Sequence, residues 1–180
     1  MNLPTFHFCV TFHFTLPFIF VLLFPKVTMR KPVVEDIPQL VSLNKLCLPE
    51  ANYDDSVWFS LVVVGEGLIE EVDGKIVGYI IAFDAAEPTL ESNEDVFKNI
   101  KLEDQLMIVS FGVHPDYRNK RIGDQLLKEF LLQHKVAMFL LVETNNTIAQ
   151  KIYNNHLFHT IRYIPNYYST NRDAILLHKE

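Results

Sequence analysis

The chain has 180 residues, a formal net charge of −6 and 49% hydrophobic residues, a composition that predicts one globular domain with a packed core. The acidic balance argues against a general nucleic-acid-binding protein, whose surface is expected to be basic. The two cysteines, Cys9 and Cys47, show no metal-ligand spacing and are too few for a disulfide framework, so a reducing compartment is expected.

The first 25 residues form a leader that differs from the rest, because MNLPTFHFCVTFHFTLPFIFVLLFP contains no Asp, Glu, Lys or Arg. Its length just reaches the roughly 20 apolar residues of a membrane span, but it lacks the basic start and the cleavage site of a signal peptide. Three interpretations of the leader stay open. It is upstream sequence before a true start at Met29, a membrane anchor, or a cleaved signal. We therefore predict a leader over 1–28, a domain over 29–180 and a cytoplasmic location, at a membrane only if the leader is retained.

The chain from residue 27 to 83 predicts a short strand, two helices and a hairpin. The first helix follows Asp36, a plausible N-cap, and is stopped by Pro49. Its apolar stripe of helical period is interrupted by the polar Asn44. The second helix, in DDSVWFSLVVV, begins at an aspartate N-cap, Asp54 or Asp55. Strands over 67–72 and 75–83 are joined at Asp73–Gly74, a strong hairpin signal.

The rest of the chain alternates buried strands with helices. An acidic insertion over 84–104, with one helical turn near Asp95–Ile100, precedes a buried central strand over 106–113. The expected elements that follow are a helix over 121–135, a strand over 136–143, a helix over 145–158 and an antiparallel pair over 159–168 and 172–180. This order predicts an α/β fold with one mixed sheet and helices on both faces.

The sequence HPDYRNKRIGDQLL places basic residues between the central strand and a helix. The first amides of a helix have no internal partners and carry a partial positive charge, so this end favours anions. Amides around Lys120–Asp124 would surround a pyrophosphate, and the side chains of Arg118, Lys120 and Arg121 would add charge at its rim. Gly123 would let the ligand approach the backbone. The alternative is a surface turn whose basic residues are merely solvated.

This stretch resembles the acetyl-CoA signature of the GNAT acetyltransferase superfamily, Arg/Gln-x-x-Gly-x-Gly/Ala. Arg118 and Gly123 match its ends, while Arg121 replaces the first glycine. NNTIAQKIYNNHLF resembles the next segment of the same superfamily, with Asn146, Ala149, Tyr153 and Phe158 in register. NYYSTNRDAILLHK, with Tyr167, Tyr168, Asp173 and Ala174, resembles the C-terminal strand pair of the N-terminal acetyltransferases and the ribosomal-protein alanine acetyltransferases. LCLPEANY resembles the first loop of the NatA catalytic subunit, with Ala51 inserted.

The resemblance implies the GNAT fold, with a mostly antiparallel mixed sheet, and acetyl-CoA as co-substrate. It implies Tyr153 as the acid that protonates the leaving thiolate and a strand amide near Phe111–Val113 as oxyanion donor. The expected cofactor-binding residues are Phe111, Gly112, Val113, Arg118, Lys120, Arg121, Ile122, Gly123, Asp124 and Asn146. The expected acceptor-binding residues are Leu48, Pro49, Tyr167 and Tyr168. The histidines show no metal-like pairing, so no metal is expected.

The general base is the weak point of the implied site. Relatives place Glu or His on the fifth strand or Tyr on the fourth, where this chain has Leu141 and Met107. Glu50, Glu143 or a water chain remain as candidates, and Glu50 matches the first-loop glutamate of the NatA-like enzymes. A site with a poor base favours an α-amine, whose pKa near 7.7–8 leaves roughly 10–20% neutral at physiological pH, over lysine near 10.4.

The expected function is therefore acetyl transfer from acetyl-CoA to the N-terminal α-amine of proteins or peptides, with an auxiliary subunit as a potential partner and no nucleic acid. Two alternatives stay open. The first is an acetyl-CoA-binding domain that has lost turnover. The second is a small-molecule amine acetyltransferase whose acidic insertion attracts a polyamine.

Overall fold

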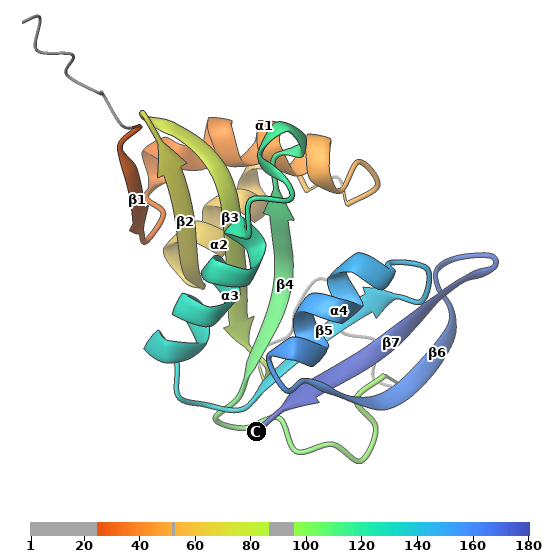
Figure 1. The fold of residues 1–180 in the computed structure, drawn as a ribbon. Helices are drawn as coiled ribbons and strands as arrows, with labels where there is room; N and C mark the ends of the chain where they lie inside the picture. Colours follow the sequence, from red (N-terminus) through yellow and green to blue (C-terminus); the bar gives the residue numbers. More distant parts are fainter. Residues whose placement is uncertain (1–24, 52, 87–95) are drawn as a thin grey trace, which may run out of the picture.

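A seven-stranded sheet forms the centre of the computed structural model, which describes residues 25–51, 53–86 and 96–180 (Figure 1). The strand order is β1-β2-β3-β4-β5-β7-β6. The strands are β1 (Val27–Arg30), β2 (Glu66–Val72), β3 (Lys75–Asp84), β4 (Leu106–Val113), β5 (Met138–Glu143), β6 (His159–Ser169) and β7 (Arg172–Lys179). The helices are α1 (Ile37–Cys47), α2 (Asp55–Val63), α3 (Ile122–Gln133) and α4 (Thr147–Asn155), with short 3-10 turns η1 (Val34–Asp36) and η2 (Pro115–Tyr117).

Strands β4 and β5 are parallel neighbours, whereas the other adjacent strands pair antiparallel. Their ladder joins Leu106–Ile108 to Met138–Leu140 and then ends. Beyond it, each strand remains paired only on its outer side, β4 with β3 and β5 with β7. We call the separated ends, Val109–Val113 and Leu141–Glu143, the β4–β5 fork. The fork leaves strand-edge backbone groups available to a ligand in the middle of the sheet.

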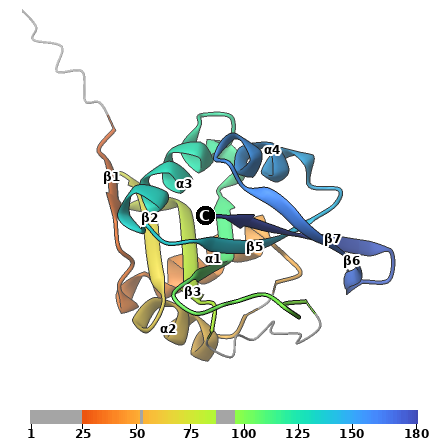
Figure 2. The ribbon, with the colours of Figure 1, turned by 90° about the horizontal axis from the view of Figure 1, so that it is seen from below.

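Helices cover both faces of the sheet, as the sequence predicted. Figures 1 and 2 show α3 and α4 on one face, and α1 and α2 on the other. Leu126, Leu127 and Phe130 of α3 are fully buried in the cluster on the first face. Leu40 of α1 and Trp58 of α2 are equally buried in the cluster on the second. The order of strands and helices in the chain is also confirmed.

The interrupted stripe of α1 has a physical explanation. Asn44, the polar residue in the middle of the stripe, is buried at 1% exposure. Its Oδ1 accepts from the Tyr79 hydroxyl of β3 at 2.7 Å, and its Nδ2 donates to the Ala51 carbonyl at 2.6 Å. Ser110 of β4 lies beside both, with its Oγ 3.0 Å from the Tyr79 oxygen. A satisfied polar network thus replaces an apolar contact where α1 meets the sheet.

Two aspartates were expected as helix caps, and only one caps with its side chain. Asp54 accepts from the Val57 amide at 3.0 Å and starts α2. Asp36 stands at the N-cap of α1 but makes no cap hydrogen bond. Its buried carboxylate instead accepts from Arg30 at 2.6 and 2.8 Å. Asp36 thus stands at the predicted N-cap position, but its side chain caps no α1 amide, because it binds Arg30 and accepts from the Val33 amide at 2.8 Å.

The first hairpin follows its sequence signal, and β1 starts earlier than the expected domain boundary. Asp73 and Gly74 both have positive φ, +50° and +82°, as a two-residue hairpin turn requires. Strand β1 begins at Val27, which pairs with Val72. The Asp73 amide also donates to the Lys26 carbonyl at 3.0 Å. Val27 and Thr28, which we assigned to the leader, therefore pair with β2 in the sheet.

The described end of the acidic insertion packs against the sheet. Val96 is 2% exposed and lies in an apolar cluster with Met107, Phe139 and Leu176. The expected helical turn near Asp95–Ile100 is a hydrogen-bonded turn, with the Ile100 amide donating to the Phe97 carbonyl at 2.9 Å, and Asp95 itself lies outside the described residues.

Candidate active site

The basic turn lies where β4 leaves the sheet and α3 begins. Arg121 is the N-cap of α3, with φ +64° in the left-handed region. Glycine adopts this conformation without strain, which explains why the related signature has glycine there. Ile122 and Gly123 follow as the first residues of the helix, and both are buried. The turn thus keeps the backbone shape of the signature although its first glycine is missing.

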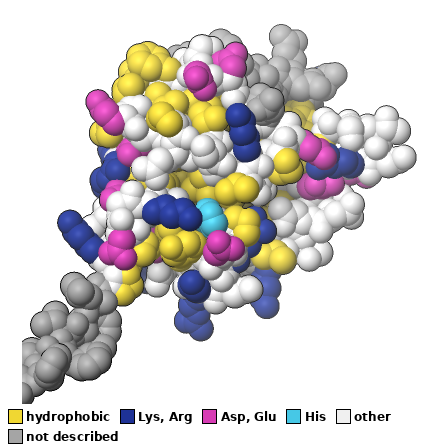
Figure 3. All heavy atoms as spheres, turned by 90° about the horizontal axis from the view of Figure 1, so that it is seen from above, with side chains coloured by type: hydrophobic (Ala, Val, Ile, Leu, Met, Phe, Trp, Pro, Cys, Tyr) yellow, Lys and Arg dark blue, Asp and Glu magenta, His cyan; other side chains and the backbone are white. Residues whose placement is uncertain are grey.

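The basic side chains of the turn differ in what they contact. The Arg118 Nε donates to the Val113 carbonyl at 3.1 Å, so this side chain ties the turn to the end of β4. The Lys120 ammonium lies 4.7 Å from the ring centroid of Tyr117. Lys and Arg side chains gather on this end of the molecule in Figure 3, around a histidine and apolar side chains. Exposed positive charge therefore adjoins the helix N-terminus, as an anion site requires.

Phe111, Gly112 and Val113 form the β4 arm of the fork and face alternately to the two sides. Phe111 and Val113 pack with the α3/α4 cluster. Gly112 faces α1, where an added Cβ would lie 2.8 Å from the Tyr79 ring and 2.9 Å from Cys47. Glycine is thus required at residue 112 for α1 to pack against the sheet.

Tyr153 of α4 is buried beside the fork. Its ring centroid lies 6.2 Å from that of Phe111 on the opposite arm and 5.8 Å from that of Phe158. Burial raises the pKa of Tyr153 well above its usual range, so the hydroxyl stays protonated at neutral pH. Within the described part of the chain its hydroxyl has no hydrogen-bond partner. A protonated O–H at this place keeps a proton that can be donated to a leaving thiolate.

Helix α4 starts and ends with polar contacts beside the fork. The Asn146 side chain, expected at the cofactor, caps α4 by accepting from the Ala149 amide at 3.1 Å. At the other end, the His156 Nε2 lies 2.8 Å from the Asp124 carboxylate of α3. This pair joins α3 to α4 through one oxygen of the Asp124 side chain.

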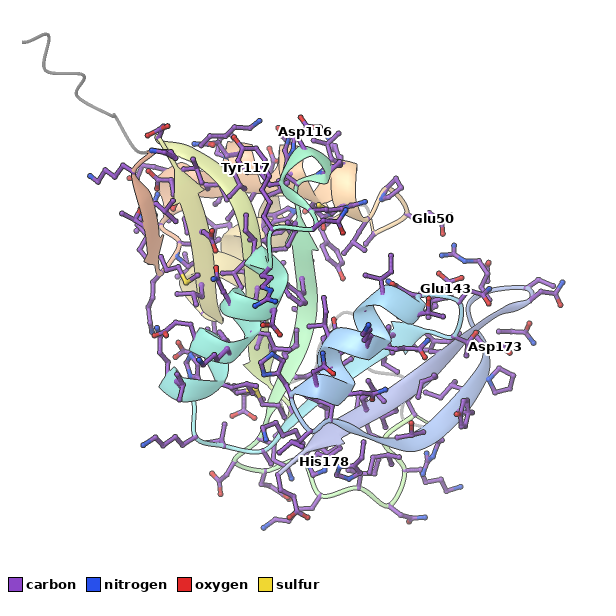
Figure 4. The ribbon with its side chains drawn as sticks, in the orientation of Figure 1. Glu50, Asp116, Tyr117, Glu143, Asp173 and His178 are labelled. Carbon is purple, nitrogen blue, oxygen red and sulfur yellow. The ribbon has the colours of Figure 1, made fainter. Side chains whose placement is uncertain are left out.

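The expected acceptor-binding residues gather on the opposite face. The loop with Leu48, Pro49 and Glu50 leads from α1 to α2, and the Tyr167 and Tyr168 rings lie edge to face with centroids 5.0 Å apart. In Figure 4, Glu50, Glu143 and Asp173 lie on one side of the molecule although they come from three different segments. The structure therefore brings the first loop and the C-terminal strand pair to the mouth of the fork.

Arg172, which the sequence analysis did not single out, joins these segments. Its Nε and Nη2 donate to the two Glu143 oxygens, each at 2.9 Å. Its Nη1 is ion-paired with Glu50. The guanidinium also lies 5.8 Å from the Tyr168 ring centroid. The only sequence signal was an arginine directly before the matched Asp173–Ala174 pair, and nothing local indicated its partners.

The positions considered for a general base lie in two kinds of surroundings, apolar or ion-paired. Met107 is buried in the apolar cluster with Phe139 and Leu176, and Leu141 packs against the same cluster. Glu143 and Glu50 both bind Arg172. The position of the usual base is thus apolar, and both carboxylates of the fork mouth are engaged by one guanidinium.

Neither a metal site nor a membrane span is found in the part of the chain that the structure describes. No group of three His, Cys, Asp or Glu side chains there is placed to hold a metal ion. No helix in residues 25–180 that the structure covers is long and apolar enough to cross a membrane. The leader over 1–24 lies outside the described residues.

Comparisons with known proteins agree with this geometry. Residues 38–157 match the acetyltransferase (GNAT) family. N-alpha-acetyltransferases of two archaea, Saccharolobus solfataricus and Sulfurisphaera tokodaii, are 31% and 29% identical, each over 83% of this chain and 90% of theirs. The solved structure of Naa50 from Arabidopsis thaliana, in complex with a bisubstrate analogue, superposes with a TM-score of 0.67 and 24% identity, over 86% of this chain and 98% of that one.

The residues of the fork fit acetyl-CoA. The helix N-terminus at Ile122 and Gly123 would hold the pyrophosphate with the charge of Lys120 and Arg121, and the open edge of β4 would take the rest of the molecule. When bound, acetyl-CoA supplies an activated acetyl group as its thioester. From the matched family, the relatives and this site, the chain belongs to the acetyltransferase (GNAT) family and is an acetyl-CoA-dependent N-acetyltransferase.

Proposed function

We propose that the acceptor is the N-terminal α-amine of a protein or peptide. The observation that carries this proposal is the apolar surrounding of Met107 and Leu141, where relatives place a base. An amine that reaches this fork must lose its proton with little help. Deprotonation at neutral pH costs an α-amine about 1 kcal/mol and a lysine side chain about 4 kcal/mol. The site thus suits the weaker base of the two.

Two comparisons support the same acceptor. The archaeal relatives are named N-alpha-acetyltransferases, and the analogue bound to Naa50 joins coenzyme A to a short peptide. The paired rings of Tyr167 and Tyr168, opposite the Leu48–Glu50 loop, offer a frame for the first residues of a chain. In this proposal Tyr153 protonates the departing thiolate, a β4 amide near Phe111–Val113 stabilises the oxyanion, and Glu50 or water accepts the amine proton.

The test is a measurement of coenzyme A release with three acceptors. They are peptides with free N-termini that vary in their first two residues, the same peptides with a blocked N-terminus and an internal lysine, and spermidine. We expect release with some of the free peptides and none with the blocked ones. Release with spermidine alone would move the chain to the small-molecule class. Binding of acetyl-CoA without any release would indicate a domain that has lost turnover.

The auxiliary subunit expected from the family likeness stays a prediction. Copurification of the tagged full chain from its native cells, followed by size-exclusion chromatography, tests it. A single species at the mass of the chain alone would contradict it.

A further inference from the structure

Arg172 links the two arms of the β4–β5 fork on the α1/α2 face. Its carboxylate partner Glu143 ends β5, so this bond lies within one arm. Its other partner, Glu50, lies in the loop after α1. That loop is held to the β4 arm by Asn44, whose amide binds the Ala51 carbonyl while its oxygen binds Tyr79 and Ser110. The Glu50–Arg172 contact therefore crosses the fork.

The geometry of the arginine suits a fixed link. Two parallel N–H···O bonds to Glu143 orient the planar guanidinium, as in bidentate arginine–carboxylate pairs. The orientation leaves Nη1 for Glu50. Among the ion pairs of the described residues, it is the one that joins the α1–α2 loop to β7 on this face, and the Asp124–His156 pair joins α3 to α4 on the other. A guanidinium has N–H donors and no acceptor atom, so Arg172 is no candidate for the base.

We propose that Arg172 is a positioning residue for the acetyl acceptor. Through Glu50 it holds the Leu48–Glu50 loop against the end of β5 and the β6–β7 hairpin, and so sets the width of the acceptor entrance. This inference rests on the proposed function. Because the helix N-terminus for acetyl-CoA lies on the opposite face, replacing Arg172 changes the KM for peptide and leaves the KM for acetyl-CoA unchanged.

The size of the effect follows from exposure. The Arg172 and Glu50 side chains are 31% and 70% exposed, so the link is screened by water and salt. We expect Arg172→Gln to raise the KM for peptide roughly 2- to 5-fold, with the KM for acetyl-CoA unchanged. Arg172→Lys restores the charge without the bidentate geometry and should recover part of the loss.

The experiment uses the full chain with Arg172→Gln, Arg172→Lys, Glu50→Gln, the double variant Arg172→Gln/Glu50→Gln and the control Lys179→Gln. Lys179 lies at the other end of β7, so the control loses the same charge far from the fork. Peptide KM, acetyl-CoA KM and kcat are measured at two salt concentrations. Amide hydrogen exchange of residues 46–51 is followed in parallel.

The proposal predicts that the double variant raises peptide KM no further than Glu50→Gln alone, because Arg172 acts through Glu50. It also predicts faster amide hydrogen exchange of residues 46–51 in Arg172→Gln and in Glu50→Gln, and unchanged exchange in Lys179→Gln. Additive effects on KM, or unchanged exchange in Arg172→Gln, would overturn it. If the wild-type chain acetylates no peptide, the proposed function fails, and the exchange measurement still decides whether the link holds the loop.

Discussion

The two faces of the β4–β5 fork are built from different amounts of chain. On the α3/α4 face, the proposed anion site comes from one continuous stretch, Phe111–Asp124, and would depend on backbone amides at a helix N-terminus. On the α1/α2 face, Glu50, Glu143 and Tyr168 come from three distant segments and are joined by Arg172.

The two faces therefore differ in how strongly their binding depends on individual side chains. A backbone site tolerates side-chain change, which is why Arg121 can stand where the signature has glycine. A site of side-chain ion pairs changes with each residue, so the acceptor face can diverge while the cofactor face is retained. Each of the following predictions tests whether the two faces act separately.

The largest effect is expected at Tyr153, which is buried beside the fork. Tyr153→Phe keeps the ring that packs on Phe111 and Phe158 and removes the hydroxyl with its acidic proton. We expect kcat to fall on the order of 100-fold, with the KM for acetyl-CoA nearly unchanged. Steady-state kinetics checks this, with Tyr163→Phe on the exposed side of β6 as matched control. A similar kcat in the two variants would exclude Tyr153 as the acid.

The Asn44 network is the support that the acceptor loop shares with the sheet. Asn44→Ala leaves the partly buried Ala51 carbonyl without its partner and the Tyr79 hydroxyl with Ser110 alone. The free energy of unfolding should fall by about 1–3 kcal/mol, and peptide KM should rise while acetyl-CoA affinity stays. Urea denaturation and calorimetry measure the two quantities. Loss of acetyl-CoA affinity in a folded Asn44→Ala protein would show that the faces are not separate.

Charge reversal tests the anion site on the other face. Arg121→Glu places a carboxylate at the N-terminus of α3 and should weaken coenzyme A binding on the order of tenfold without unfolding the domain. Lys128→Glu, on the exposed side of the same helix, makes the same change in net charge and should bind normally. Isothermal titration calorimetry with coenzyme A measures these affinities. Equal affinity of Arg121→Glu and wild type would show that this turn does not bind the pyrophosphate.

The smallest effect is expected when the glycine of the signature is restored. Arg121→Gly relieves the strain of a left-handed residue with a side chain and should stabilise the fold by up to about 1 kcal/mol. The same change removes one positive charge, so coenzyme A affinity should fall less than in Arg121→Glu. Thermal unfolding checks the first part. A lower unfolding temperature would mean that the Arg121 side chain contributes more than its backbone costs.

The sequence predicted the order of the elements, the Asp73–Gly74 turn, an N-cap at Asp54 or Asp55, and the basic turn before α3. Each depends on residues within a few positions of one another, where periodicity, capping and turn preferences act. The resemblance of four segments added the family for the same reason, since its motifs are short and continuous.

Only the tertiary structure decided what lies across the fork. Asp36 was expected to cap α1 and instead binds Arg30 of β1, Asn44 interrupted a stripe and proved to anchor a loop, and Arg172 had no local signal at all. The partners of these side chains lie 6 to 122 positions away, and no period or motif of the chain encodes such distances. A charged or polar residue reveals that it needs a partner, but the fold selects which one.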